Sequence, residues 1–168
     1  MPIRPFRLPK ILLVAALALL ISLIAFGNMT DYGSNFAYVQ HVMSMDTIFP
    51  GSSITYRAIT TTWMQHAAYL LIIAVQTLTA WLCWVGAWRM WRRRAASVAQ
   101  FEQAKKLAVI GLSLGLGLWL VGFMAIGGEW FGMWMSVHWN GVATAAHLVL
   151  ILLAALIYLG QHEPEPTS

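Results

Sequence analysis

The chain has 168 residues, of which 60% are hydrophobic and 10% are charged, and its formal net charge is +4. The apolar residues gather in four long runs, which is the pattern of an integral membrane protein rather than of a soluble domain. The single cysteine, Cys83, excludes a disulfide framework and a thiolate metal cluster. The basic excess does not indicate a nucleic-acid partner, because the positive charges flank the apolar runs, where membrane topology and anionic lipid head groups explain them.

The four runs predict transmembrane helices near residues 11–27, 66–88, 107–126 and 142–160. A helix needs about 20 apolar residues to cross the hydrocarbon core, and the first run is at the short end of that range. The runs do not alternate in polarity, which excludes a transmembrane β-barrel. We therefore expect an all-α membrane protein with one four-transmembrane-helix bundle over residues 1–160. Residues 161–168 are expected to form a disordered cytoplasmic tail.

The first run also has features of a cleaved signal peptide, since it follows basic residues and ends near the small residues Ala25 and Gly27. A signal peptide has an apolar core of only about 7–15 residues. The run is longer than that, so we expect this helix to be retained.

The basic residues orient the chain, because nine of the ten lie on one side of the four runs and only Arg57 lies on the other. Short loops rich in lysine and arginine stay in the cytoplasm. Both termini and the loop between the second and third helices are therefore expected to be cytoplasmic. The nine residues are Arg4, Arg7, Lys10, Arg89, Arg92, Arg93, Arg94, Lys105 and Lys106.

The first outward loop is too long and too apolar to be a bare connector. Residues 35–45 place Phe36, Val39 and Met43 at helical spacing. We expect a short amphipathic helix here, with Ser34 or Asp31 as its N-cap and a break at Pro50 and Gly51.

The second outward loop, residues 127–141, contains three tryptophans, among them Trp130 and Trp139, followed by Asn140. One interpretation is an aromatic belt that anchors helix ends at the membrane surface. The other is a folded cap in which this loop closes over the bundle and meets the first loop. A sharp turn at Gly127 and Gly128 would allow that closure.

Charged residues on the outward side are few. The acids are Asp31, Asp46 and Glu129, and the single base is Arg57. An unpaired base near hydrocarbon is costly, so we expect Arg57 to form an ion pair between the loops, with Glu129 as the favoured partner. Asp31 and Asp46 are the alternatives.

Two cofactor hypotheses arise from histidine and methionine. Thioether and imidazole groups suit Cu(I), and both outward loops carry such groups, although methionine is also common apolar filler. A pair of histidines at similar depth on two helices is a minimal signal for a b-type haem. The copper candidates are His41, Met45, Met133, Met135 and His138, and the haem candidates are His66 and His147.

The third helix contains a GxxxG pattern formed by Gly111 and Gly115. Small residues at this spacing let helices approach closely. The pattern predicts either packing within the bundle or contact with another membrane protein or a second copy of the chain.

Several short polar signatures resemble a bacterial family of predicted small integral membrane proteins, catalogued as domain of unknown function number 2165. The resemblance covers nearly the whole chain and implies a four-helix protein of the bacterial inner membrane, without an assigned activity, cofactor or catalytic residue. The segments that carry it are residues 28–32, 35–36, 41–46, 57–59, 127–131 and 139–141.

No catalytic motif is present in the sequence, and no acidic or basic residue lies centrally in an apolar run, where a transporter usually carries charge. The sequence therefore predicts a non-enzymatic accessory, assembly or partner-binding component with a folded outward cap. The alternative is a protein that binds Cu(I) or haem on its outward side.

Overall fold

The computed structural model describes residues 6–162, and this part of the chain is helical with no β-strand. Four helices are long and apolar enough to cross a membrane. They are α1 (Arg7–Thr30), α3 (Thr62–Arg92), the continuous pair α5 (Lys106–Gly117) and η2 (Leu118–Trp130), and α6 (Val142–Gly160). The expected all-α membrane class is confirmed. The last predicted span matches α6, and the other three helices extend beyond their predicted ends.

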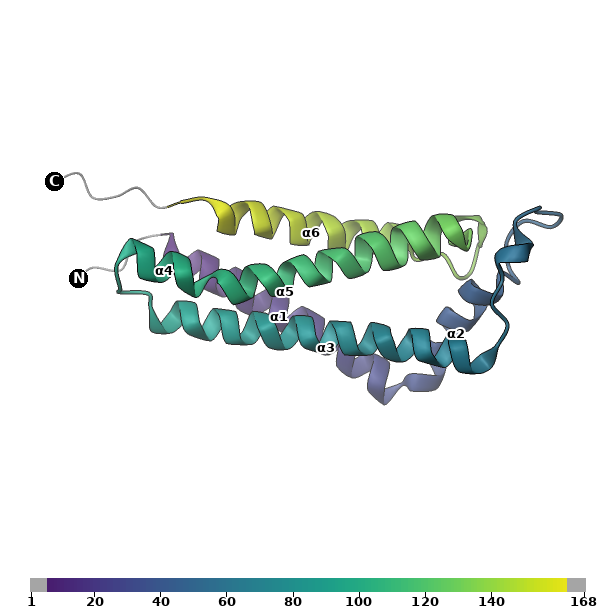
Figure 1. Cartoon of the computed structure of the whole chain (residues 1–168), viewed down its shortest axis with the longest axis horizontal. Coiled ribbons are helices and arrows are strands. Elements are labelled where there is room, and N and C mark those ends of the chain that lie inside the picture. The colour runs from purple at the N-terminus through teal and green to yellow at the C-terminus, as the bar shows by residue number, and fades with distance from the viewer. Residues whose placement is uncertain (1–5, 163–168) are drawn as a thin grey trace.

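The long helices run along one axis, with the start of α1 and the end of α6 at the same end of the molecule (Figure 1). The short helix α4 (Val98–Ala104) lies at this end, and α2 (Tyr32–Ser44) lies at the opposite end. The start of α1 and the end of α6 lie at the same end because the chain crosses the bundle an even number of times. Of the predicted tail, residues 163–168 lie outside the described residues, and Gln161 accepts a hydrogen bond from Lys10.

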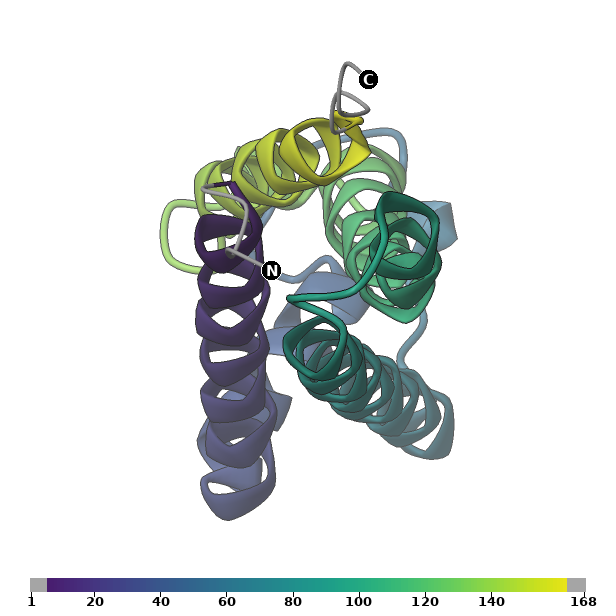
Figure 2. The same ribbon diagram turned by 90° about the vertical axis from the view of Figure 1, so that its left-hand side faces the viewer.

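The packing order is α1 against α3, α3 against α5, and α6 against both α5 and η2, with a smaller contact between α6 and α1 (Figure 2). The closest approach is between α3 and α5. A Cβ atom added to Gly86 would lie 2.5 Å from the backbone nitrogen of Ala108, so only glycine fits at this crossing.

The GxxxG glycines belong to the same crossing. A Cβ atom on Gly111 would lie 2.9 Å from Leu82 and 3.0 Å from the Cys83 sulfur, and one on Gly115 would lie 3.1 Å from Thr79. Of the two predicted roles for Gly111 and Gly115, packing within the bundle is the one that these contacts with α3 support. Their small size serves packing within the protein.

The third long helix changes its winding halfway. From Leu118 it continues as a π-helix, and the Phe131 backbone nitrogen donates to the Ile126 oxygen at 3.0 Å. The predicted sharp turn at Gly127 and Gly128 is wrong, because the helix runs through both glycines. The chain reverses instead at Gly132, whose φ of +65° lies in the left-handed region that favours glycine.

Three basic side chains at the end opposite α2 are buried. Arg7, Lys10 and Lys105 are 1%, 2% and 4% exposed. The Arg7 guanidinium donates to the backbone oxygens of Arg94 and Ala96, and Lys105 donates to the Leu159 oxygen and pairs with Glu102. Arg7 therefore ties α1 to the connection between α3 and α4, and Lys105 ties the end of α4 to α6.

Candidate functional site: a cap over the helix ends

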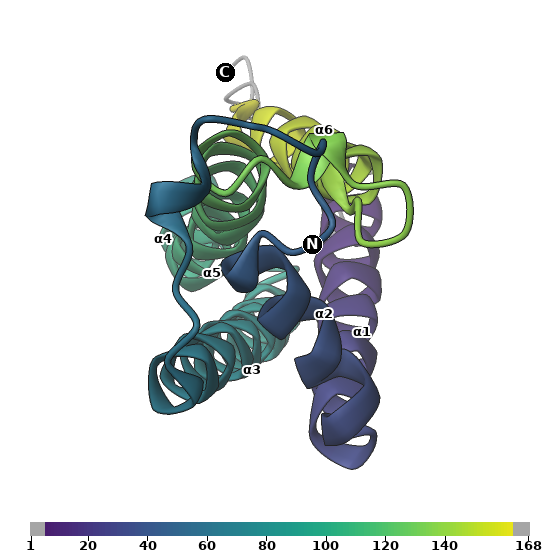
Figure 3. The ribbon, with the colours of Figure 1, turned by 90° about the vertical axis from the view of Figure 1, so that its right-hand side faces the viewer.

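The functional candidates predicted from the sequence lie mostly in two segments that cover one end of the helices. We define the cap as residues 31–61 together with residues 131–141. It contains α2 and two short 3-10 turns, η1 (Thr55–Arg57) and η3 (Met133–Met135). Figure 3 shows α2 lying across the ends of α1 and α3, with the rest of the first segment passing over the other helices.

The predicted amphipathic helix is confirmed as α2, which buries Val39 and Met43. It ends at Ser44, because Met45 adopts the left-handed conformation with φ of +52°, well before Pro50. Asp31 occupies the N-cap position, but its side chain makes no capping hydrogen bond. The other candidate, Ser34, lies inside the helix, so the predicted side-chain cap is wrong.

A buried glutamine attaches the end of α2 to the start of α3. Gln65 is 1% exposed, and its Nε2 donates to Ser44 Oγ at 2.9 Å and to the Ile59 oxygen at 2.8 Å. Both bonds satisfy polar groups that would otherwise be buried without partners. Gln65 thus fixes both ends of the intervening loop to the spanning helix.

The predicted haem histidines do not share a site. His66 stacks on Phe36, with ring centroids 3.9 Å apart, and its Nδ1 lies 2.8 Å from the Tyr32 hydroxyl. His147 is exposed on α6, a helix that packs against α5 and η2. The haem hypothesis therefore gains no support, because His66 is part of the aromatic contact between α2 and α3.

The two cap segments contact each other through several polar and aromatic pairs. Thr47 Oγ1 lies 2.8 Å from Ser136 Oγ, and the Tyr38 hydroxyl donates to the Met133 sulfur at 2.8 Å. Further along, His41 stacks on Trp139 with ring centroids 4.5 Å apart. The predicted meeting of the two outward loops in one folded unit is confirmed by these contacts.

The Tyr38 side chain contacts several residues of the second cap segment. Its ring meets that of Trp139 edge to face at 6.0 Å, and a Cβ atom added to Gly141 would overlap its hydroxyl. Burial raises the pKa of Tyr38 above its ordinary value, although a hydrogen bond with the Gly141 backbone opposes this shift. The phenol is therefore a neutral hydrogen-bond donor throughout the physiological pH range.

The predicted copper ligands are held apart by other contacts. His41 Nδ1 pairs with Asp46 at 2.8 Å, the Met133 sulfur accepts the Tyr38 hydroxyl, and His138 is exposed. Met45 is buried and packs in the apolar core beneath the cap, and the Met135 methyl lies beside Gly132. The structure therefore does not assemble these groups around one point.

Arg57 does not form the predicted ion pair. The ion pairs in which both partners are described residues include His41–Asp46 and Lys105–Glu102, and none of them involves Arg57. The Arg57 guanidinium instead lies 4.7 Å from the centroid of the Trp130 ring and 3.4 Å from the Trp130 carbonyl oxygen. The reason is that η2 continues through the glycines, which leaves Glu129 exposed and presents Trp130 to the first segment.

Asn140 has a structural role at the start of α6. Its Oδ1 accepts from the Val142 backbone nitrogen at 3.1 Å, and its Nδ2 donates to the Trp134 oxygen at 3.3 Å. The first bond satisfies one of the free donors at a helix N-terminus. Asn140 therefore fixes where the second cap segment ends.

An exposed aromatic surface lies on the outside of the cap and at the end of η2. Tyr56 and Trp130, which are 76% and 52% exposed, flank Arg57. Phe49 and Trp134 meet edge to face at 5.7 Å and are 55% and 45% exposed. Gly132 joins the two groups, because it lies between Trp130 and Trp134 in the chain and beside Ile48 and Ile54 in space. We call these five side chains, Phe49, Tyr56, Arg57, Trp130 and Trp134, the aromatic surface.

Beneath the cap, a cavity of about 350 Å³ lies between α1, α3, η2 and α6. Gln76 is 2% exposed and lines it, accepting a hydrogen bond from Asn28 Nδ2 at 2.8 Å. Among the described residues, the Gln76 Nε2 has no acceptor. Gln76 lies within a predicted span, and nothing in the sequence identifies Asn28, 48 positions away, as its partner.

The fold and the capped end together define a polytopic α-helical membrane protein with four spanning helices. A family model described as predicted small integral membrane protein (DUF2165) matches residues 6–162, and the chain belongs to this family. The function of that family is not known. No curated protein and no solved structure matches the chain.

Proposed function

We propose that the protein is a non-enzymatic component of the bacterial inner membrane whose aromatic surface binds another membrane protein. The proposed orientation places both termini in the cytoplasm and the cap outside. The orientation is supported by the basic residues, since those outside the cap flank the helix ends opposite it.

The observation that carries this proposal is the composition and support of the aromatic surface. Tryptophan, tyrosine and arginine dominate the energetics of protein interfaces. An aromatic belt needs only rings at the correct depth. Here three of the rings come from the two cap segments, which are joined by Thr47–Ser136 and Tyr38–Met133, and Trp130 ends η2. The segments that carry the surface are therefore held together before any partner arrives.

Arg57 adds to this argument. Its guanidinium lies over the rings of Tyr56 and Trp130, and no carboxylate of the described residues pairs with it. A stacked arginine still presents donors at the edge of its plane. The surface is therefore suited to a partner segment that carries an acidic or carbonyl-rich group beside apolar side chains.

Photo-cross-linking in native membranes tests the proposal. A benzophenone amino acid in place of Tyr56 is expected to form a discrete protein adduct, and Trp130→Ala is expected to abolish that adduct. The matched control is the same amino acid in place of Trp81, which is 59% exposed on the spanning part of α3. Only lipid adducts at both positions would contradict the proposed partner binding.

A further inference from the structure

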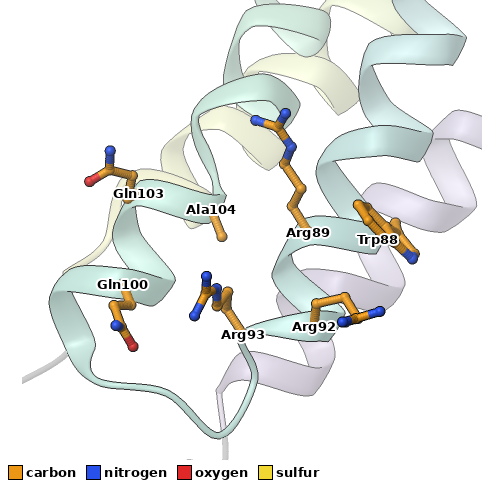
Figure 4. A pocket seen from close by; sticks show the side chains of 7 residues that line it. All are labelled: Trp88, Arg89, Arg92, Arg93, Gln100, Gln103 and Ala104. Atoms are coloured by element: carbon orange, nitrogen blue, oxygen red, sulfur yellow. The ribbon is translucent and has the colours of Figure 1, made fainter.

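A second candidate site lies at the end of the molecule opposite the cap. A pocket of about 600 Å³ opens between the end of α3 and α4. Its lining is Trp88, Arg89, Arg92, Arg93, Gln100, Gln103 and Ala104. Figure 4 shows Arg93 in the space between the two helices, with Ala104 on the α4 side and Arg89 one turn earlier on α3.

The arginines of this pocket differ from other basic residues at the same end. Arg94 donates to the Trp91 oxygen and lies 4.2 Å from the centroid of that ring, and Lys105 pairs with Glu102. By contrast, the guanidinium groups of Arg89 and Arg93 have no hydrogen-bond or ion-pair partner among the described residues. Within residues 6–162, the Arg92 guanidinium has only a ring contact, 5.6 Å from the centroid of Trp88.

Within the part of the chain that the structure describes, the charge around this pocket is therefore uncompensated. Three positive side chains line it with two neutral amides, and Glu102, the acid of α4, is already paired with Lys105. Guanidinium groups bind phosphate through planar, charge-assisted hydrogen bonds. Topology alone requires basic residues near a helix end, but it does not require three of them to line one cavity.

The position of the pocket also favours a phosphate-bearing ligand. The 31 residues of α3 form a helix about 46 Å long, which exceeds the hydrocarbon thickness of about 30 Å. The helix is therefore long enough for its end, which carries Arg89 and Arg92, to reach head-group depth. Trp88 is 57% exposed beside the pocket, as expected of an indole at the membrane interface.

We propose that this pocket binds a phosphate group, with Arg89 and Arg93 as its principal ligands. The group is either the phosphodiester of an anionic phospholipid or a soluble phosphate. The volume lies within the range of about 300–1,000 Å³ that is usual for small-ligand sites. This site is independent of the aromatic surface and of the partner proposed for it.

Native mass spectrometry of the full-length protein provides the test. Binding of phosphatidylglycerol and of phosphatidylcholine is measured in one arm, and binding of inorganic phosphate in the other. Arg93→Gln and Arg89→Gln are each expected to weaken binding of one phosphate species about tenfold, which corresponds to about 1.4 kcal/mol for a lost charged hydrogen bond. Arg94→Gln removes the same charge outside the pocket and is expected to change binding less than twofold.

The arm that responds identifies the source of the phosphate. If phosphatidylglycerol binding is weakened by loss of Arg89 or Arg93, the pocket is a lipid site. If inorganic phosphate binding is weakened in the same way, the ligand is soluble. An equal loss in Arg94→Gln would show a general charge effect and overturn the proposal. Binding that is unchanged in both pocket variants would overturn it as well.

Discussion

Gly86→Val is expected to prevent stable folding or to remove most of the protein's thermal stability. The added Cβ would lie 2.5 Å from the Ala108 nitrogen and 2.8 Å from the Ala108 Cα. These are backbone atoms of a packed helix, so they cannot move aside as a flexible side chain would. Overpacking typically costs about 1–3 kcal/mol, and a backbone clash belongs at the top of that range or above it.

The matched control is Gly117→Val, because nothing lies within 4 Å of a Cβ atom at Gly117. Both variants insert the same side chain into an apolar helix. Thermal unfolding in detergent, followed by loss of the monomer peak, is expected to separate them clearly. Similar melting temperatures for the two variants would contradict the close crossing of α3 and α5.

Arg7→Met is expected to lower the free energy of unfolding by about 3 kcal/mol, because a charged group contributes about 1.5–3 kcal/mol through its hydrogen bonds and its loss leaves acceptors unpaired. Arg7 donates to the Arg94 oxygen at 3.0 Å and to the Ala96 oxygen at 2.7 Å. It also lies 4.6 Å from the centroid of the buried Phe101 ring. Methionine keeps much of the apolar volume but supplies no donor.

Arg89→Met removes the same charge from the same end of the molecule and serves as the control. The Arg89 side chain is exposed and makes no hydrogen bond to another described residue. Its loss is expected to change stability in detergent by less than about 0.5 kcal/mol, as for other surface substitutions. Equal destabilisation of the two variants, measured by equilibrium unfolding in mixed micelles, would show that Arg7 acts only through net charge.

The spanning helices and α2 were predictable because their signals are local. Apolar length alone identified the span ending at Gly160, and the spacing of Val39 and Met43 identified the buried face of α2. The position of Arg57 was not predictable in the same way. The partner of Arg57 depends on whether the third spanning helix ends before or after Glu129. The Gly127–Gly128 pair does not decide where the helix ends, because packing can favour a helix that continues through it.

The cap contacts were only partly predictable for a related reason. The richness of both loops in aromatic residues suggested a folded unit, but the pairs Thr47–Ser136 and Tyr38–Met133 join residues about 90 positions apart. Such pairs depend on how the spanning helices are arranged. The same holds for Asn28 and Gln76, and for the burial of Arg7, whose acceptors lie on the α3–α4 connection.

The cap as one folded unit on the outward side is the claim on which the proposed function rests. A cysteine pair at Thr47 and Ser136 tests it directly. The two hydroxyl oxygens are 2.8 Å apart, which is compatible with the Cβ separation of about 3.5–4.5 Å in a disulfide. The outward compartment of a bacterial cell is oxidising, so the bond needs no added oxidant there.

The expected result is a disulfide within one chain for Thr47→Cys/Ser136→Cys, detected as a reducible mobility shift in membranes from untreated cells. Thr47→Cys/Val137→Cys is the control, since Val137 is the adjacent residue and is 86% exposed. The single variants account for the native Cys83, which is buried. Absence of the disulfide in the first pair, or equal formation in the control pair, would contradict the folded outward cap.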